Sequence, residues 1–143
     1  MNIVKNLSMV ILMQHDLEKA ITFYKALGCT LRFSIPGQWA EFGLGNITIG
    51  LCPTESSTEN RRTGLVFAVD DIQSFYEAHK DTIPFLHEPI IKMHGGMASI
   101  QDPHGNIIDL YQATPEKIKE ALKKQPSERC CKGSEAGPCC CKA

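Results

Sequence analysis

The chain has 143 residues, of which 43% are hydrophobic and 22% are charged, and its formal net charge is −1. These values are typical of one soluble globular domain with a single core. A charge so close to zero excludes the basic surface with which nucleic-acid-binding and membrane-surface proteins attract their partners. The apolar run from Met9 to Met13 is too short for a signal-peptide core or a membrane span, so we expect a cytoplasmic protein.

The first half of the chain predicts a βαβββ module over about residues 5–52. Residues 7–13, LSMVILM, are rich in apolar side chains and predict a buried strand. Asp16 is a good N-cap for the helix that follows, because apolar residues then recur at helical spacing until Gly28. Three short strands joined by tight turns complete the module, at residues 30–35, 39–44 and 47–52.

The second half repeats this order over about residues 63–112. Residues 53–62 carry no large apolar side chain and predict a linker between the modules. Asp70 or Asp71 then caps a helix over 72–80, which a strand at 64–69 precedes and strands near 84–91, 96–101 and 107–111 follow. The fold class is therefore expected to be α+β, with two tandem βαβββ modules.

The two modules can be aligned residue by residue. Matching the acidic starts of the two helices places Met9 over Gly64. Matching LGNITIGL in the first module with HGNIIDLY in the second places Ile49 over Asp109. Asp109 is the one charged residue among these four, and it lies within an apolar run, where an unpaired carboxylate is costly to bury.

The stretches HDLEKAITFYKALGCTLRF, VDDIQSFY and DPHGNIIDLY resemble the vicinal oxygen chelate superfamily, over roughly residues 5 to 113. That superfamily includes glyoxalase I, extradiol dioxygenases, fosfomycin-resistance enzymes and bleomycin-resistance proteins. The resemblance implies that the two modules form a cup-shaped mixed sheet, and that two chains pair as a homodimer in which each cup is built across subunits. It implies no particular reaction, because one fold hosts many chemistries.

In the metal-dependent members of that superfamily, His or Gln and Glu side chains hold a divalent cation at four points, which fall here on Met9, Ile49, Gly64 and Asp109. Such a cation needs several oxygen or imidazole ligands. Met9 offers only a thioether, which suits copper(I), and Ile49 and Gly64 offer no donor atom. We therefore expect no metal in the cup and no cofactor.

Two histidines remain as possible helpers of Asp109 if this alignment misplaces a ligand. His94 precedes two glycines and His104 lies in the turn Pro103-His104-Gly105. Both are expected to be exposed loop residues rather than ligands.

Strand alternation predicts which side chains line the cup. Trp39, Glu41, Ser99 and Gln101 would supply stacking and hydrogen bonds from the intervening strands, and Glu41 with Asp109 is a candidate pair for acid/base catalysis. The alternative is that the apolar members are ordinary core. The other expected lining residues are Met9, Ile11, Met13, Ile49, Leu51, Gly64, Val66, Ala68, Asp109 and Tyr111.

Two functions from different classes are compatible with this cup. The first is a bleomycin-resistance-like protein that binds a small, largely apolar organic molecule without a metal. The alternative is a lyase or dioxygenase that uses Asp109 and a divalent metal, so whether the protein is an enzyme stays open at this point.

The C-terminal segment offers a third possibility. Residues 114–125 predict a helix that docks on the body, which would close a domain spanning residues 1–125. Residues 126–143 are expected to be disordered. Clustered thiols bind soft metals or metalloids, although this spacing is not that of a structural zinc site, and a redox-reactive or incidental terminus is the alternative. The clustered thiols are Cys130, Cys131, Cys139, Cys140 and Cys141.

Overall fold

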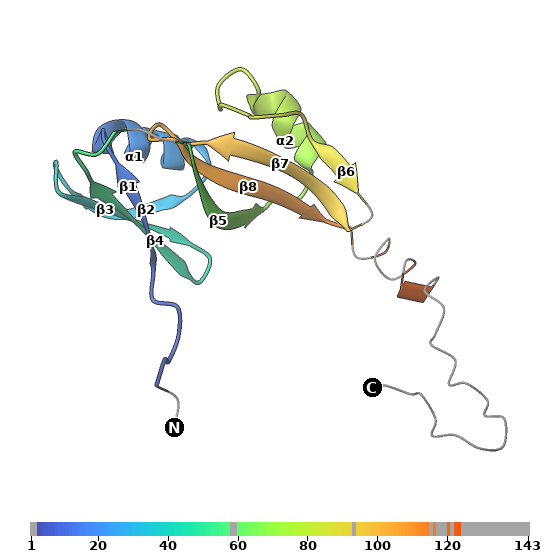
Figure 1. Cartoon of the computed structure of the whole chain (residues 1–143), viewed down its shortest axis with the longest axis horizontal. Coiled ribbons are helices and arrows are strands. Elements are labelled where there is room, and N and C mark those ends of the chain that lie inside the picture. Colours follow the sequence, from blue (N-terminus) through green and yellow to red (C-terminus); the bar gives the residue numbers. More distant parts are fainter. Residues whose placement is uncertain are drawn as a thin grey trace, which may run out of the picture.

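Two four-stranded mixed sheets, each with its own helix, lie next to each other in the computed structural model (Figure 1). The structure describes residues 3–57, 60–92, 94–114, 116, 120, 122 and 123. The first module has strand order β1-β4-β3-β2 and the second has the same arrangement, β5-β8-β7-β6. The prediction of an α+β fold with two tandem βαβββ modules is confirmed.

The elements of the first module are β1 (Val10–Gln14), α1 (Leu17–Ala26), β2 (Thr30–Ile35), β3 (Trp39–Leu44) and β4 (Ile47–Pro53). Those of the second are β5 (Arg61–Ala68), α2 (Ile72–His79), β6 (Ile90–Lys92), β7 (Gly95–Gln101) and β8 (Asn106–Ala113). In each module the first strand pairs in parallel with the last, and the remaining pairs are antiparallel.

Both helices begin at a capping aspartate. The side chain of Asp16 accepts a hydrogen bond from the Lys19 backbone N–H, and Asp71 does the same for Ser74, so one unpaired donor of each first turn is satisfied. The helices cover one face of their sheets. There they bury a single apolar cluster that includes Tyr24, which packs against Phe42 of β3.

The opposite face of each sheet is not covered by a helix in the described part of the chain. Large apolar side chains on this face remain accessible: Ile11 is 51% exposed, Phe33 is 47% exposed and Val66 is 55% exposed. We call these two surfaces the open faces. They are the surfaces on which the cup was predicted.

Three strands begin three or more residues away from the predicted start. The first strand begins at Val10 rather than residue 7, since pairing with β4 starts there. Arg61 and Arg62 belong to β5 rather than to the linker, because they pair with the start of β8. The sixth strand shrinks to Ile90–Lys92, since Pro84 and Pro89 lack the N–H that a ladder needs.

Among the described residues, no helix is long and apolar enough to cross a membrane. The predicted helix over 114–125 falls mostly outside the described residues, and the predicted disordered segment 126–143 with its five cysteines falls entirely outside them. Both stay predictions.

Candidate functional site

Strand register decides which side chains share the open face of the first module. Val10 pairs with Ile49 and Leu12 with Leu51, and paired residues project to the same side. Ile49 and Leu51 therefore join Leu12 in the buried core beneath α1. The prediction that they share a face with Ile11 and Met13 is wrong.

The true counterpart of Asp109 in the first module is Gly50. Gly50 pairs with Ile11 and Asp109 pairs with Val66, and each partner lies five residues before the aspartate that caps its module's helix. Matching Gly45-Asn46 with Gly105-Asn106 had shifted the sequence alignment of the two modules by one residue at this strand. Its two asparagines differ in structure, because Asn46 is exposed in a turn whereas Asn106 is 2% exposed and begins β8.

The second module brings a polar cluster together around Asp109 on its open face. The Ser99 hydroxyl donates to Asp109 Oδ1 at 2.6 Å, since β7 and β8 place these two residues directly opposite each other. His87 Nε2 lies 3.3 Å from the same Ser99 oxygen. The other ring nitrogen of His87, Nδ1, lies 2.8 Å from the carbonyl oxygen of Glu88. Arg62 Nη1 completes the cluster, 3.9 Å from Asp109 Oδ1.

Burial differs strongly within this cluster. Ser99 is 5% exposed, whereas the side chain of Asp109 is 25% exposed and that of Arg62 is 74% exposed. The serine is thus fixed, while the carboxylate and the guanidinium remain accessible from the open face. Among the described residues, Asp109 Oδ2 has no hydrogen-bond partner.

Sequence reasoning missed His87 and Arg62. Arg62 was assigned to the linker. His87 lies between Pro84 and Pro89 in a segment without a regular period, so no alternation rule predicts where its ring points. Ser99 and Asp109 had a usable signal, because both sit at alternating positions of clear strands.

The first module contributes Trp39 and Glu41 to its own open face. Glu41 pairs with Gly50 across β3 and β4. Arg32 Nη1 lies 3.9 Å from Glu41 Oε2 and donates to the Thr48 hydroxyl at 2.6 Å. Glu41 and Asp109 therefore lie in different modules, each beside its own arginine, and no interaction of the described residues joins the two carboxylates.

The remaining predicted lining residues are scattered along the open faces. Gln101 donates to Asn60 at 2.6 Å, and the Tyr111 hydroxyl donates to the His94 carbonyl. Met9 lies half-buried before β1. Gly64 has a positive φ of 74°, and a Cβ added there would meet no atom within 4 Å.

A divalent metal of the kind bound by metal-dependent relatives does not fit these residues. Of the four positions that the resemblance assigned to metal ligands, only Asp109 carries a hard donor, and the corrected register puts Gly50 in the place of Ile49 without adding one. The guanidinium of Arg62 beside Asp109 also opposes a cation by charge repulsion. Within the described part of the chain, no three His, Cys, Asp or Glu side chains are grouped so that they could hold a metal ion.

His104 is buried, not exposed. It is 3% exposed, and its Nδ1 accepts a hydrogen bond from the His15 backbone N–H at 3.0 Å. The preceding Asp102 explains this, because its carboxylate anchors the turn that carries His104 and is 4% exposed. His94, in contrast, is exposed as predicted.

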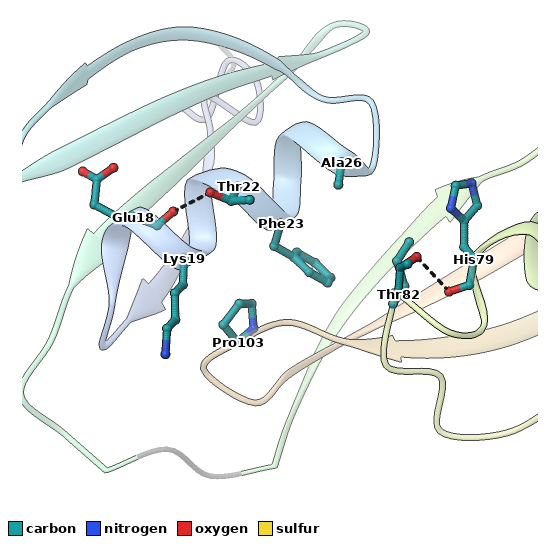
Figure 2. Close-up of a pocket in the computed structure, with 9 residues that line it drawn as sticks. Glu18, Lys19, Thr22, Phe23, Ala26, His79, Thr82 and Pro103 are labelled. Carbon is teal, nitrogen blue, oxygen red and sulfur yellow. Dashed lines mark hydrogen bonds between the residues drawn. The ribbon is translucent and has the colours of Figure 1, made fainter.

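Three cavities of the described residues lie away from this polar cluster. One of about 730 Å³ lies between α1, residues 79–83 and Pro103, and Figure 2 shows Phe23 pointing from α1 into the space between Pro103 and Thr82. Two smaller ones, of about 260 and 150 Å³, lie where the modules meet, and Ile49 and Val66 line the smaller. None of the three is lined by Asp109, Ser99, Trp39 or Glu41, and the smallest contains the predicted lining residues Ile49, Val66 and Ala68.

Comparison with known proteins decides the family. The model of the Glyoxalase/Bleomycin resistance protein/Dioxygenase superfamily matches residues 6–110. The chain belongs to this superfamily. No curated protein sequence matches the chain.

Solved structures of low sequence identity share the superfamily fold. The fosfomycin resistance protein FosX from Listeria monocytogenes superposes with a TM-score of 0.69 at 17% identity, covering 83% of this chain and 99% of that one. Lactoylglutathione lyase from Agrobacterium tumefaciens gives 0.60 at 21% identity, covering 76% and 94%. A mutant of the same FosX, complexed with Mn(II) and 1S,2S-dihydroxypropylphosphonic acid, gives 0.67 at 16% identity, covering 84% and 99%.

Proposed function

We propose that the protein binds a small organic molecule without a metal ion. The molecule would lie between the open face of a first module and the open face of a second module. The observation that carries this proposal is the cluster of Asp109, Ser99, His87 and Arg62, which stands where metal-dependent relatives keep their ligands. It offers both hydrogen-bond donors and acceptors, but Asp109 is its only carboxylate, and no three His, Cys, Asp or Glu side chains of the described residues are grouped so that they could hold a metal ion.

The chemistry of the cluster indicates what part of a ligand it takes. Asp109 Oδ2 accepts a hydroxyl or ammonium group of the ligand, and the exposed guanidinium of Arg62 donates to an acceptor group beside it. The rest of the open faces is largely apolar, with Ile11 and Val66 more than half exposed. The ligand is therefore a mostly apolar molecule with a compact polar end.

A second copy of the chain completes the site in this proposal. The open faces expose large apolar side chains, and none of the three cavities of a single chain reaches Trp39 or Asp109. Pairing the open face of the first module with that of the second module from another chain would bury these side chains and enclose Asp109. Each homodimer would hold two cups.

One observation favours an enzyme of the superfamily as the second candidate. The Ser99 hydroxyl, with the His87 ring beside it, holds the Asp109 carboxylate in one orientation, so that Oδ2 can take a proton from a substrate. The relative FosX is seen with Mn(II), and a lyase or dioxygenase would need a comparable metal here. The third candidate, a thiophilic metal site at Cys130, Cys131, Cys139, Cys140 and Cys141, lies outside the described residues.

Elemental analysis of the purified full-length protein separates the three candidates. After incubation with Mn(II) or Zn(II) and desalting, we expect no stoichiometric metal that depends on Asp109. The matched variants are Asp109→Asn, which keeps the shape of the side chain, and a variant with the five C-terminal cysteines changed to serine. Metal that Asp109→Asn removes would contradict the proposal and favour the enzyme. Metal that only the serine variant removes would favour the thiol site.

A further inference from the structure

In the first module, the flat ends of two side chains lie directly against glycines of the neighbouring strand. A Cβ added at Gly50 would lie 2.5 Å from Cζ2 of Trp39 and in contact with Cη2 as well, which is closer than real Cβ atoms come. The indole of Trp39 therefore rests directly on the backbone of β4. In the same way a Cβ at Gly43 would lie 2.9 Å from Arg32 Nε, so the guanidinium rests on β3.

These two side chains form what we call the planar platform, defined as Trp39 and Arg32. Both lie on the open face. Gly50, under the indole, pairs with Ile11 and Glu41 of that face, and Gly43, under the guanidinium, lies two residues after Glu41 on the same strand and pairs with Thr48. The guanidinium is held by its hydrogen bond to Thr48 and by the nearby Glu41 carboxylate. The platform is thus a fixed surface rather than a pair of mobile side chains.

The indole of the platform lies at the position of the first module that corresponds to Asp109 in the second. Gly50, on which the indole lies, is the counterpart of Asp109, so the first module presents an aromatic plane at the position where the second presents a carboxylate. A tryptophan that served only the core would point toward α1, as Phe42 does from the same strand. Trp39 and Arg32 instead lie on the open face, the surface to which the proposed function assigns the ligand.

We propose that the bound molecule carries a planar aromatic ring that stacks on Trp39, with an acceptor group directed toward Arg32. This inference rests on the proposed function. Aromatic rings prefer offset stacking on one another, and the guanidinium, whose side chain is 44% exposed, has N–H donors to spare after its contact with Thr48. The ligand class is an aromatic acid or a similar flat molecule with an acidic or carbonyl group.

Naphthalene-1-carboxylate and its saturated decahydro analogue test this directly on the full-length protein. Both carry the same charge and similar bulk, but only the first can stack. Isothermal titration calorimetry should give a Kd roughly 2- to 10-fold lower for the aromatic acid. Because Trp39 is the single tryptophan of the chain, one indole N–H signal in a ¹⁵N NMR spectrum reports whether the ring lies over it.

Two glycine variants provide matched controls. Gly50→Ala displaces the indole without deleting it, and should abolish the preference for the aromatic acid while leaving the saturated acid bound. Gly43→Ala displaces only the end of Arg32, and should weaken both acids equally while keeping the aromatic preference. Trp39→Leu repeats the first test with an apolar side chain in place, and circular dichroism checks that each variant is folded.

The outcomes separate this inference from the proposed function. Equal Kd values for the two acids, with an unchanged indole signal, would overturn the inference and leave the proposed function standing. Binding of neither acid would count against both. An indole signal that the aromatic and the saturated acid shift equally would show that no ring stacks on Trp39, which also overturns the inference.

Discussion

At the scale of single residues, Asp102 is a buried carboxylate with five hydrogen-bond donors around it. Its Oδ2 accepts hydrogen bonds from Gln14 and Tyr24 at 2.7 Å and from Asn106 at 2.9 Å, and its Oδ1 accepts two backbone N–H groups. Gln14 and Tyr24 belong to the first module and Asp102 to the second. One buried carboxylate therefore joins the two modules.

We predict that Asp102→Asn destabilises the protein by about 2–4 kcal/mol, because the amide that replaces Oδ2 would face donors with a donor of its own. Urea unfolding of the purified variant measures this. Tyr24→Phe is the milder control, since it removes one donor and leaves the carboxylate with four. If Asp102→Asn changed the free energy of unfolding by less than roughly 0.5 kcal/mol, the hydrogen bonds of Asp102 would not be what holds the two modules together.

The state of Tyr24 supports this role. Burial raises the pKa of the Tyr24 hydroxyl far above its usual range, and the Asp102 carboxylate raises it further. The hydroxyl therefore stays protonated and remains a donor at every pH at which the protein is folded. Neither Tyr24 nor Asp102 was expected to matter from the sequence, because their pairing joins residues 78 positions apart.

At the scale of elements, α2 begins at Asp71, whose carboxylate caps the first turn. The hydrogen bond from the Ser74 backbone N–H lowers the pKa of Asp71. A group with a lowered folded-state pKa stabilises the fold above its unfolded-state pKa, near 3.8, and the stabilisation is lost as the pH falls through the folded-state value.

We predict that Asp71→Asn keeps the cap but removes this pH dependence. Its stability curve should be flatter than that of the wild type below about pH 4, while the two should be similar near pH 7. Thermal unfolding of both proteins across this range measures the difference. Curves that stay parallel down to about pH 2 would mean that Asp71 makes no titrating contribution to α2.

The elements also show what sequence patterns can predict here. Helix α1 was predictable because its cap, its apolar spacing and Gly28 agree with one another. The register of β4 was not, because a one-residue slip moves Ile49 and Leu51 to the other face while leaving the apolar pattern unchanged. His104 was misjudged for a similar reason, since turn residues predict exposure but a distant module covers this turn.

At the scale of the whole molecule, the described part of a single chain leaves the two open faces uncovered. Ile35 is 44% exposed, Ile90 is 47% exposed and Val66 is 55% exposed, one from the first module and two from the second. Sequence alternation placed Ile11 and Val66 on these faces but misplaced Ile49 and Leu51. It also could not show that the three cavities described above miss Trp39 and Asp109. That depends on how the modules are joined.

We predict that the protein sediments as a homodimer and that Val66→Asp shifts it toward the monomer. The new carboxylate would be buried without a partner if another chain covers Val66. Sedimentation velocity over a range of concentrations measures the shift, with Thr22→Asp on the exposed side of α1 as the control. A wild-type protein that stays monomeric at every concentration would contradict a cup shared between subunits.

The proposed function assigns Asp109 to a site for an organic ligand and not to a metal centre. This assignment can be tested by titrating the ¹⁵N-labelled full-length protein with Mn(II), a paramagnetic ion that broadens nearby amide signals. We expect no broadening centred on Asp109, and we expect the wild type and Asp109→Asn to respond alike. Saturable broadening of Met9, Gly64 and Asp109 together, lost in Asp109→Asn, would contradict it.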